Sequence, residues 1–409
     1  MVVGSGAREH ALAWALASRA QVVVTPGNDG MRAHGLTCVD TAAGDLDADL
    51  FVIGPEQPLV EGLADDLRDQ GKVVVGPGRA GAQLEGSKAY MKEFLTAAGV
   101  PSADFATFDA PEAAVAFLRT LRAPYVVKTD GLAAGKGVLV TQDFDEACAD
   151  VRAKLSGRAF GAAGERIIVE EGLDGAECSL LVLCDGQVAL PLAAAQDFKR
   201  VGDDDLGANT GGMGAYAPME LGDDQVTTIM RDIVAPTLVE LARRSIDFRG
   251  VLYAGVMLSA RGPQLLEYNV RFGDPEAEVL AALYGGELLD LLVRVGEGRL
   301  AGAAAPVRGA AVTVVLASAG YPASARTGDP IDGLGADGQL REAHPGVVVF
   351  HAGTVRDAQG RFYTAGGRVL CVTATGSSLE QARTRAYEAA SLVTFEGRVM
   401  RRDIARDAL

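Results

Sequence analysis

The stretch EYNVRFGDPE, residues 267–276, follows an apolar run at 251–258 and a short turn at 260–263. This pattern predicts a β-hairpin whose second strand lies at 264–272. Successive side chains of a strand point to opposite faces, so the polar side chains share one face and the aromatic and aliphatic ones share the other. The apolar face is expected to pack on a core. The polar face is too polar to bury unless a ligand lies in front of it.

The polar face carries Glu267, Asn269 and Arg271 in a row, and Asp274 follows where the strand ends. Mg²⁺ takes one or two protein oxygens together with substrate phosphate oxygens, and Glu267 and Asn269 offer such a pair. A guanidinium such as that of Arg271 binds a phosphate or a carboxylate through two parallel hydrogen bonds. The alternative to such a ligand site is an exposed strand face with an ordinary salt bridge.

The composition is typical of a well-packed α/β protein. A chain of 409 residues suggests about three domains, and 48% hydrophobic residues with 51 glycines argue against disorder. The net charge of −16 argues against a nucleic-acid or anionic-membrane partner. The five cysteines are scattered without a CxxC pair, which indicates free thiols in a reducing compartment. The four histidines lack metal-ligand spacing, so no zinc site is expected.

Membrane and secretion signals are not apparent in the chain. No apolar run approaches the ~18 residues that span a membrane, and the N-terminal residues lack the plan of a signal peptide. We therefore expect a cytoplasmic protein without a membrane partner, as a monomer or a weak homodimer.

The N-terminal part alternates strands with helices, which indicates a small parallel sheet that binds ligands at the carboxyl ends of its strands. Its strands are expected at 1–3, 22–24, 50–53 and 73–75. The loop GSGAREH at 4–10 suggests a dinucleotide site, but Glu9 stands where that motif has glycine. The second strand ends in Thr25-Pro26, where NAD binding needs an acid. A nicotinamide site is therefore not expected.

Residues 128–138, KTDGLAAGKGV, predict two strands joined by a loop of small residues, with a lysine on each arm. This is not a Walker A loop, because its glycines are too closely spaced and Gly137 takes the place of the Ser or Thr. A glycine-rich hairpin can still lay backbone N–H groups over phosphates, with Lys128 and Lys136 supplying charge. A flexible surface hairpin with solvated lysines is the alternative.

Two further segments suit a nucleotide or another anion. The acidic EEGLDGAE at 170–177 follows a strand at 166–170 and offers backbone groups to an adenine edge, while Glu177 offers a carboxylate to ribose hydroxyls. An ordinary acidic loop is the alternative. The charged QDFKRVGD at 196–203 leads into the glycine-rich NTGGMGAY at 209–216, a combination that favours close backbone approach to an anion.

The rest of the chain predicts helices around the hairpin and a β-rich end. Helices are expected at 223–245 and 275–296. A small-residue linker at 301–306 then precedes a β-rich module. Its strands are expected at 310–317, 347–353 and 367–373, and its final helix at 378–392.

In this order, the stretches resemble the ATP-grasp ligases, and closely resemble the phosphoribosylamine–glycine ligase family. The resemblance covers nearly the whole chain and rests on motifs that include GSGAREH, KTDGLAAGKGV, QDFKRVGD, NTGGMGAY and EYNVRFGDPE. The chain departs from the family where Ala7 replaces a glycine and where the segment 39–49 is short. Met257 stands where many ATP-grasp enzymes have a second acidic metal ligand.

The resemblance implies an α/β protein in three parts. These are an N-terminal parallel α/β domain at 1–86, a central ATP-grasp domain at 87–300 with a small lid subdomain at about 105–172, and a C-terminal β-rich α+β module at 301–409. It also implies that ATP, with Mg²⁺ or Mn²⁺, drives the joining of glycine to 5-phosphoribosylamine through a glycyl phosphate. The products are glycinamide ribonucleotide, ADP and phosphate, in purine biosynthesis.

The resemblance further implies roles for single residues. Glu267 and Asn269 are the expected metal ligands, and Arg271, Asp274 and Asn269 are expected at the reacting groups. The nucleotide is expected to contact Lys88, Lys128, Gly135, Lys136, Gly137, Glu170, Glu171, Leu173 and Glu177. The other substrates are expected to contact Glu9, Glu56, Asp197, Lys199, Arg271, Asp274 and Arg368. For Arg368, which follows two glycines, the expected ligand is the ribose 5-phosphate and a structural salt bridge is the alternative.

Two other functions are weighed against this one. Another ATP-grasp ligase, which activates a different carboxylate, would share 128–138 and 267–271 but not GSGAREH, QDFKRVGD and NTGGMGAY together. A catalytically silent ATP-binding regulatory protein would have lost an acid or a lysine of the phosphate site, and this chain keeps them all.

Overall fold

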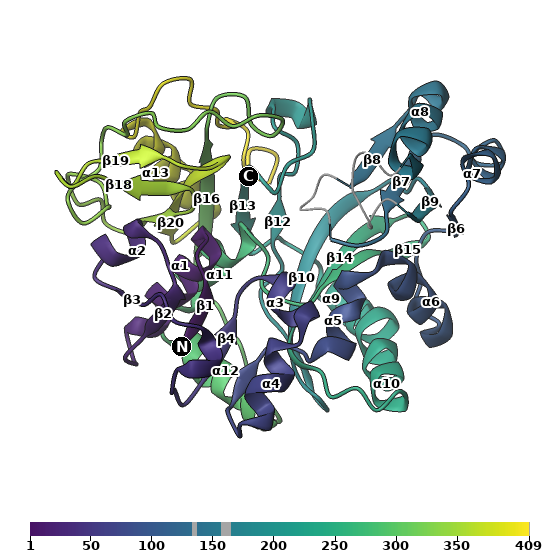
Figure 1. The fold of residues 1–409 in the computed structure, drawn as a ribbon, viewed down its shortest axis with the longest axis horizontal. Helices are drawn as coiled ribbons and strands as arrows, with labels where there is room; N and C mark the ends of the chain where they lie inside the picture. Colours follow the sequence, from purple (N-terminus) through teal and green to yellow (C-terminus); the bar gives the residue numbers. More distant parts are fainter. Residues whose placement is uncertain (133–136, 157–164, 409) are drawn as a thin grey trace.

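The computed structural model describes residues 1–132, 137–156 and 165–408. These residues form four sheets of four or five strands and one two-stranded sheet. The N-terminal and C-terminal sheets lie at one side of the molecule, and a smaller sheet with two helices projects at the other side (Figure 1). The central sheet lies between the two sides.

The N-terminal sheet is parallel throughout, as predicted, with the strand order β3-β2-β1-β4-β5. Its strands are β1 (Val2–Gly4), β2 (Val23–Pro26), β3 (Thr37–Cys38), β4 (Phe51–Ile53) and β5 (Val74–Val75). Its helices are α1 (Ala7–Ala17), α2 (Asp29–Ala33), α3 (Glu56–Glu61), α4 (Leu63–Asp69) and α5 (Arg79–Gly86). The direction of the strand order reverses at β1, so the loops after β1 and β4 open side by side.

The central sheet is antiparallel, with the order β11-β10-β14-β15. Its strands are β10 (Ala176–Asp185), β11 (Ala189–Pro191), β14 (Arg249–Ser259) and β15 (Gly262–Asn269). The predicted hairpin is confirmed as β14 and β15, but β15 ends before Phe272 because its pairing with β14 stops at Asn269. The alternation of side-chain directions continues beyond the last paired residue, since Tyr268, Val270 and Phe272 are all buried.

The smaller sheet is antiparallel, with the order β6-β9-β7-β8, and β7 and β8 are the two arms of the predicted glycine-rich hairpin. Its strands are β6 (Phe105–Phe108), β7 (Tyr125–Thr129), β8 (Val138–Thr141) and β9 (Ile167–Glu171). Two helices pack on it, α7 (Pro111–Leu118) and α8 (Phe144–Leu155). Leu118, Val127, Val151 and Val169 belong to a hydrophobic core that is separate from the cores of the other sheets.

The C-terminal sheet is antiparallel, with the order β12-β13-β16-β20-β17. Its strands are β12 (Gln196–Asp197), β13 (Gly214–Ala217), β16 (Ala310–Ala317), β17 (Val347–His351) and β20 (Arg368–Gly376). The helix α13 (Leu379–Ser391) packs on it, and β18 (Thr354–Arg356) pairs with β19 (Phe362–Thr364) nearby. Because β12 and β13 precede residue 300, this sheet draws strands from both sides of the expected boundary. The domain limits stay predictions.

The remaining helices pack between and around the sheets. They are α6 (Lys88–Ala98), α9 (Asp223–Ile229), α10 (Ala235–Arg243), α11 (Glu276–Tyr284) and α12 (Glu287–Glu297). The helix expected at 223–245 includes a π-helical turn at Met230–Val234. The helix expected at 275–296 is two helices, because Gly285 adopts a φ of 51° and ends α11. The helix α11 contacts α1, β16 and β20, so it lies between the N-terminal and C-terminal sheets.

Two expectations about the whole chain can be compared with the structure. All five cysteines are free, as the sequence predicts, and all but Cys38 are buried. Across 1–132, 137–156 and 165–408, no helix has the length and apolar character needed to cross a membrane.

Candidate active site

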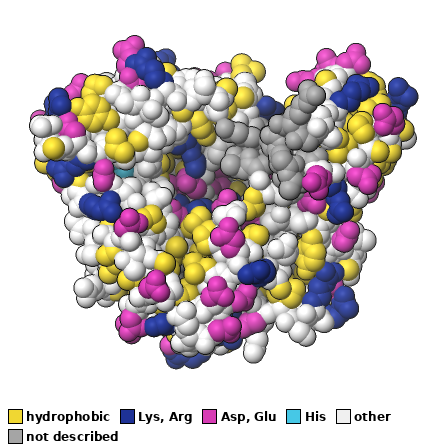
Figure 2. Space-filling model, in the orientation of Figure 1, with side chains coloured by type: hydrophobic (Ala, Val, Ile, Leu, Met, Phe, Trp, Pro, Cys, Tyr) yellow, Lys and Arg dark blue, Asp and Glu magenta, His cyan; other side chains and the backbone are white. Residues whose placement is uncertain are grey.

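A cavity of about 740 Å³ opens where the N-terminal, central and smaller sheets meet. Its wall includes the first turns of α1, α3 and α6, parts of β7, β8, β10, β14 and β15, and residues of the segment 196–211. Figure 2 shows a hollow near the middle of this face, with acidic and basic side chains inside it. The volume lies within the ~300–1,000 Å³ that small-molecule sites occupy.

Most residues singled out in the sequence lie in the wall of this cavity. They are Glu56, Lys88, Lys128, Gly137, Glu170, Glu171, Leu173, Glu177, Asp197, Lys199, Glu267, Asn269, Arg271, Asp274 and Arg368. Gly135 and Lys136 lie outside the described residues. Glu9 is not part of the wall.

Glu9 caps α1 instead. Its Oε2 accepts a hydrogen bond of 2.6 Å from the Gly6 N–H, and its Oε1 accepts one of 2.6 Å from Arg8 Nε. A carboxylate at a helix N-terminus satisfies backbone N–H groups that have no partner in the helix. A Cβ at Gly54 would stand 2.1 Å from Oε1, so glycine is needed there to make room for the carboxylate. Glu9 thus shapes the loop, and Arg8 lines the cavity.

Glu267 presents its carboxylate to the cavity. Within the part of the chain that the structure describes, it makes no hydrogen bond and no ion pair. Burial, the largest influence, acts to raise the pKa of Glu267, but nearby cations, Lys88 and Lys128 foremost, outweigh it and lower the pKa below its ordinary value. Glu267 therefore stays ionised.

Arg271 is already held by two carboxylates. Its Nη2 donates to Glu85 Oε1 at 2.6 Å, and its Nε donates to Glu56 Oε2 at 3.3 Å. The same Nη2 donates to Asn269 Oδ1 at 3.1 Å. The other oxygen of Glu85 accepts the Val270 N–H at 2.8 Å. Arg271 is therefore oriented before any ligand binds, by a glutamate to which the sequence assigned no role, because the two residues lie 186 positions apart in the chain.

Glu170 supports two lysines. It is 2% exposed, and its Oε2 lies 3.1 Å from Lys128 Nζ and 3.3 Å from Lys92 Nζ. Burial lowers the pKa of Lys92 to about 8, against the attraction of Glu170. Glu170 Oε2 is thus engaged with two lysines, while its Oε1 has no hydrogen-bond partner among the described residues, and a contact of Glu170 with a nucleotide stays a prediction. Lys92 was missed by the sequence analysis, although its place on the apolar face of α6, beside Met91 and Leu95, is an unusual one for lysine.

Lys199 lies among acidic groups. Its Nζ donates to Asp197 Oδ1 at 2.8 Å and to Glu177 Oε2 at 3.4 Å. Glu276 also lines the cavity, and its Oε1 accepts the Tyr253 hydroxyl at 2.6 Å. Burial, followed by the charge of Asp197, raises the pKa of Glu276. This acidic part of the wall is suited to a group that carries an amine.

Arg368 forms an ion pair. Its Nη2 lies 2.9 Å from Asp274 Oδ2, and its Nη1 donates to Asp274 O at 2.9 Å and to Gly211 O at 2.5 Å. The guanidinium is therefore engaged with protein oxygens, which is the salt bridge that the sequence left as the alternative to a phosphate site. The ion pair joins β20 to the end of the hairpin and to the glycine-rich loop.

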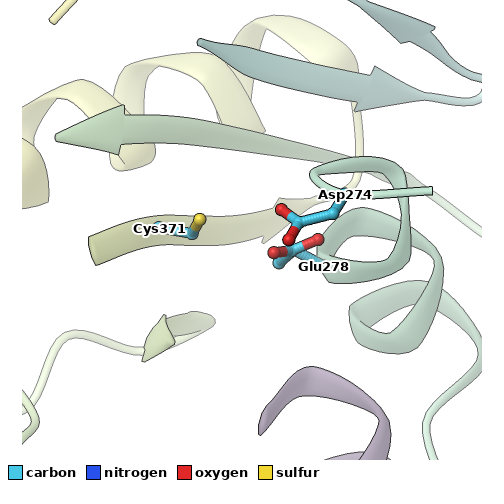
Figure 3. A group of neighbouring side chains, drawn as sticks. All are labelled: Asp274, Glu278 and Cys371. Carbon is cyan, nitrogen blue, oxygen red and sulfur yellow. The ribbon is translucent and has the colours of Figure 1, made fainter. Parts of the chain in front are cut away.

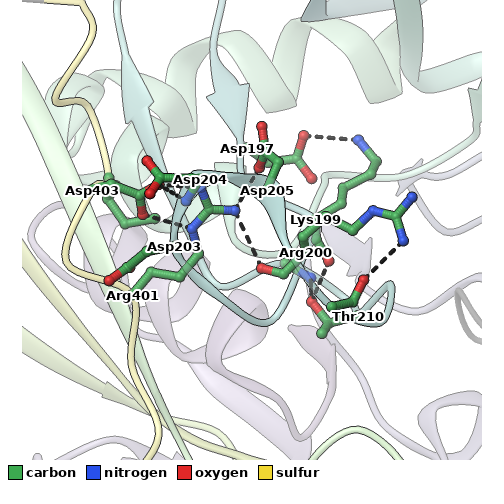
Figure 4. A network of polar contacts seen from close by, with 12 residues as sticks. Asp197, Lys199, Arg200, Asp203, Asp204, Asp205, Thr210, Arg401 and Asp403 are labelled. Atoms are coloured by element: carbon green, nitrogen blue, oxygen red, sulfur yellow. Dashed lines mark hydrogen bonds and ion pairs between the residues drawn. The ribbon is translucent and has the colours of Figure 1, made fainter.

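The segment 197–211 is held by the C-terminal tail, residues 398–408 (Figure 4). Arg401 is 1% exposed and donates to Asp205 Oδ1 at 2.6 Å, to Arg200 O at 3.2 Å and to Asp403 Oδ1 at 2.7 Å. Asp403 Oδ2 accepts the Asp204 N–H at 2.8 Å. The last residues of the chain thus fix the position of a segment that lines the cavity.

The oxygens on the polar face of the hairpin fit a hard divalent cation. Glu267 offers an ionised carboxylate without a protein partner in the described residues, and Asn269 offers an amide oxygen from the same strand face. One or two protein oxygens leave the remaining positions of such an ion to phosphate oxygens or water. Met257, on β14, lines the cavity without adding an acid.

A central antiparallel sheet, a smaller sheet across the cavity from it, and lysines around a free carboxylate define the ATP-grasp class of proteins. The three domain models of phosphoribosylglycinamide synthetase match the chain, the N domain at 1–85, the ATP-grasp (A) domain at 86–277 and the C domain at 311–407. The chain therefore belongs to the phosphoribosylglycinamide synthetase family.

Individual relatives extend over the whole chain. The chain is 44% identical over 424 residues to phosphoribosylamine–glycine ligase of Caulobacter vibrioides, with 100% of this chain and 98% of the relative covered. The crystal structure of phosphoribosylamine–glycine ligase from Thermotoga maritima matches with a TM-score of 0.87 at 34% identity, covering 99% of each chain. The biotin carboxylase domain of Hydrogenobacter thermophilus 2-oxoglutarate carboxylase, at 15% identity, shares the fold, with a TM-score of 0.71 over 98% of this chain and 91% of that one. The predicted family and fold class are confirmed.

Proposed function

We propose that this chain joins glycine to 5-phosphoribosylamine at the expense of ATP, and releases glycinamide ribonucleotide, ADP and phosphate in purine biosynthesis. The observation that carries the proposal is the cavity wall, in which Glu267, which has no ion pair to any described residue, lies among lysines and adjoins the acidic groups around Lys199. The first zone suits a nucleoside triphosphate with its cation, and the second suits an amine. The relatives from Caulobacter vibrioides and Thermotoga maritima carry the name of this activity.

The reaction requires activation of a carboxylate, which is a poor electrophile. A carboxylate oxygen of glycine attacks the γ-phosphorus of ATP, the bond to the β-phosphate oxygen breaks, and ADP leaves as glycyl phosphate forms. The amine nitrogen of 5-phosphoribosylamine then attacks the acyl carbon, loses a proton and displaces phosphate. Such catalysis depends on positioning and charge neutralisation rather than on a covalent bond to the protein.

The phosphate zone is formed by the hairpin face and its lysines. Glu267 and Asn269 would hold Mg²⁺ or Mn²⁺, which supplies charge neutralisation at phosphate oxygens when bound. Lys88 and Lys128 provide cationic donors to the phosphates, with Lys128 kept in place by its ion pair to Glu170. These cations also keep Glu267 ionised and able to bind a metal.

The adenosine zone lies between the smaller and central sheets. Gly137 and the connection between β9 and β10, which includes Leu173, line the cavity there. Glu177 faces the same space, and its carboxylate is the group we assign to the ribose hydroxyls. Glu171 forms an ion pair with Arg261 at 2.6 Å, so its part in nucleotide binding is assigned to its backbone.

The acceptor zone adjoins the phosphate zone, because Arg271 donates to Asn269 Oδ1. We assign Arg271 and Asp274 to the reacting carboxylate and amine, because both line the cavity beyond Glu267 and both are oriented by ion pairs. Glu56, Asp197 and Lys199 also line the cavity and are assigned to 5-phosphoribosylamine.

An acyl phosphate hydrolyses readily, so water must be kept out while it exists. The smaller sheet and its helices, at about 105–172, pack around a core of their own. A part with its own core can move as one body, so we assign it the role of a lid over the nucleotide.

An ADP-release assay tests the function. ADP release is expected only when ATP, glycine and 5-phosphoribosylamine are all present with a divalent cation, and mass spectrometry should identify glycinamide ribonucleotide. Parallel assays with Mg²⁺ and Mn²⁺ identify the preferred ion. Turnover with another carboxylate in place of glycine would identify a different ATP-grasp ligase. ATP binding without ADP release in every mixture would identify a regulatory protein. Oligomeric state and cellular location stay predictions.

A further inference from the structure

The side chains of Asp274, Glu278 and Cys371 lie close together (Figure 3). Asp274 ends the hairpin stretch, Glu278 lies in the first turn of α11, and Cys371 lies in β20. One ligand atom from each lies within 4.8 Å of the other two. Glu278 is fully buried and Cys371 is 1% exposed, whereas Asp274 is partly exposed and lines the cavity.

Three buried oxygens of the cluster lack a hydrogen-bond partner among the described residues. They are Asp274 Oδ1, Glu278 Oε1 and Glu278 Oε2. If both carboxyl groups were ionised, two like charges would face each other and three acceptors would have no donor. Each buried acceptor without a donor is destabilising, because it loses its hydrogen bonds to water and gains none in the protein. An arrangement with both groups ionised is therefore strongly unfavourable.

Two hydrogens are enough to give all three of these oxygens a hydrogen-bond partner. A proton on Glu278 makes its carboxyl a donor to Asp274 Oδ1, and the thiol hydrogen of Cys371 is then available to the second oxygen of Glu278. Burial, followed by the charge of Asp274, raises the pKa of Glu278 well above its ordinary value, while Arg368 acts in the opposite direction. Burial likewise raises the pKa of Cys371, so its thiol keeps the hydrogen.

The surroundings of Glu278 favour the neutral acid. Arg368 pairs with Oδ2 of Asp274 and therefore compensates the charge of that residue. The elements packed on this side of α11 contribute apolar side chains, among them Ala7 and Ala11 of α1 and Val315 of β16. A metal ion at this place would require two carboxylates and a thiolate next to the Arg368 guanidinium, which burial opposes.

We propose that Glu278 is a protonated positioning residue of the ligase, whose carboxyl O–H holds Asp274 Oδ1 and thereby fixes Asp274 Oδ2 on Arg368. This inference rests on the proposed function, in which Asp274 meets the reacting groups. The chain Cys371–Glu278–Asp274–Arg368 then links β20 to the reaction site, and the hydrogen bond of Arg368 to Gly211 O extends it to the glycine-rich loop.

Two variants of the full chain test the proposal kinetically. Glu278→Gln keeps a donor and an acceptor without a titrating proton, and Glu278→Leu keeps the volume without either. Glu278→Gln is expected to stay within about twofold of the wild type in kcat and in every KM. Glu278→Leu is expected to raise the KM of glycine or 5-phosphoribosylamine at least tenfold while the KM of ATP stays within twofold. The proposal would be overturned if both variants showed the same change in kcat or KM. It would also be overturned if the kinetics of Glu278→Leu matched those of the wild type.

Infrared spectroscopy tests whether Glu278 carries a proton, and this measurement does not depend on catalytic turnover. The difference spectrum between the wild type and Glu278→Gln should contain the C=O band of a carboxylic acid at pH 7 and pH 8, and this readout decides the matter if Glu278→Leu does not fold. A carboxylate band in its place would overturn the proposal. So would a stoichiometric metal ion that is lost in Cys371→Ser. If the acid band is present but the wild type makes no glycinamide ribonucleotide, the proton assignment is supported and the proposed function is the part that fails.

Discussion

Single residues of the cavity fall into two electrostatic groups. Glu85 and Glu170 are each engaged with a cation, and they orient Arg271 and Lys128. Glu267 has no such partner in the described residues and stays ionised because of the cations near it. A paired carboxylate acts through its partner, whereas an unpaired one is available to a cation from solution. Substitutions in the two groups should therefore have different effects.

Glu267→Gln is expected to lower kcat by about 100-fold or more, which corresponds to ~2.7 kcal/mol of activation free energy. The amide keeps the shape of the side chain but removes the charge from the expected metal site. Steady-state assays over a range of Mg²⁺ concentrations measure the effect, and the exposed Glu112→Gln on α7 serves as the control. A kcat within threefold of the wild type at low Mg²⁺ would remove Glu267 from the metal site.

At the level of elements, the C-terminal tail and the segment 197–211 behave as one unit. Asp204 and Asp205 have φ values of 55° and 53°, in the left-handed region that residues other than glycine rarely adopt. Asp204 N–H is held by Asp403, and the Asp205 carboxylate is held by Arg401. The tail therefore stabilises an unfavourable backbone next to the cavity, and it should influence substrate binding without touching substrate.

Arg401→Met is expected to lower the free energy of unfolding by about 3 kcal/mol, because it leaves the buried Asp403 without its cation. The KM of glycine or 5-phosphoribosylamine should rise several-fold more than that of ATP, since the loosened segment includes Asp197 and Lys199, which are assigned to 5-phosphoribosylamine. Denaturant unfolding and steady-state kinetics measure the two effects. The neighbouring, exposed Arg402→Met should change neither. Lost stability with all three KM values unchanged would restrict Arg401 to a structural role.

At the level of the whole molecule, three histidines join the N-terminal and C-terminal sheets. His10 Nδ1 accepts the His351 N–H at 3.0 Å, so neutral His10 carries its hydrogen on Nε2 and donates it to His34 Nδ1 at 2.9 Å. Burial lowers the pKa of His10 and His34, and lowers that of His351 to about 4. The interface therefore contains neutral imidazoles, which acid would charge.

The free energy of unfolding is expected to fall on acidification. The histidine pKa values are lower in the folded state, so the unfolded chain binds more protons below its own pKa of about 6.5. The contribution of the neutral histidines to the free energy of unfolding is complete above that pH. It is lost as the pH falls toward 4, by up to ~1.4 kcal/mol per pH unit for each histidine. Urea unfolding between pH 8 and pH 5 measures the slope. His10→Gln should make it shallower, and His344→Gln, outside the cluster, should not. Equal slopes in all three proteins would contradict the assignment.

The sequence by itself determined the elements and the direction of many functional side chains. The alternation of polar and apolar residues over 267–272 correctly separated Glu267 and Asn269, which line the cavity, from the buried Tyr268. This succeeded because successive side chains of a strand point to opposite faces whatever the strand packs against. The alternation of strands and helices likewise determined the parallel N-terminal sheet. These features depend on interactions between residues that are close in the chain.

Only the tertiary structure decided which charged groups meet. Arg271 pairs with Glu85 across 186 residues, and Arg401 binds Asp205 across 196. Periodicity indicates which face of an element is buried, but it carries no information about what covers that face. The sequence left open whether Arg368 binds a phosphate or a salt-bridge partner, and the fold places Asp274 against it, because the partner of a buried charge is set by long-range packing.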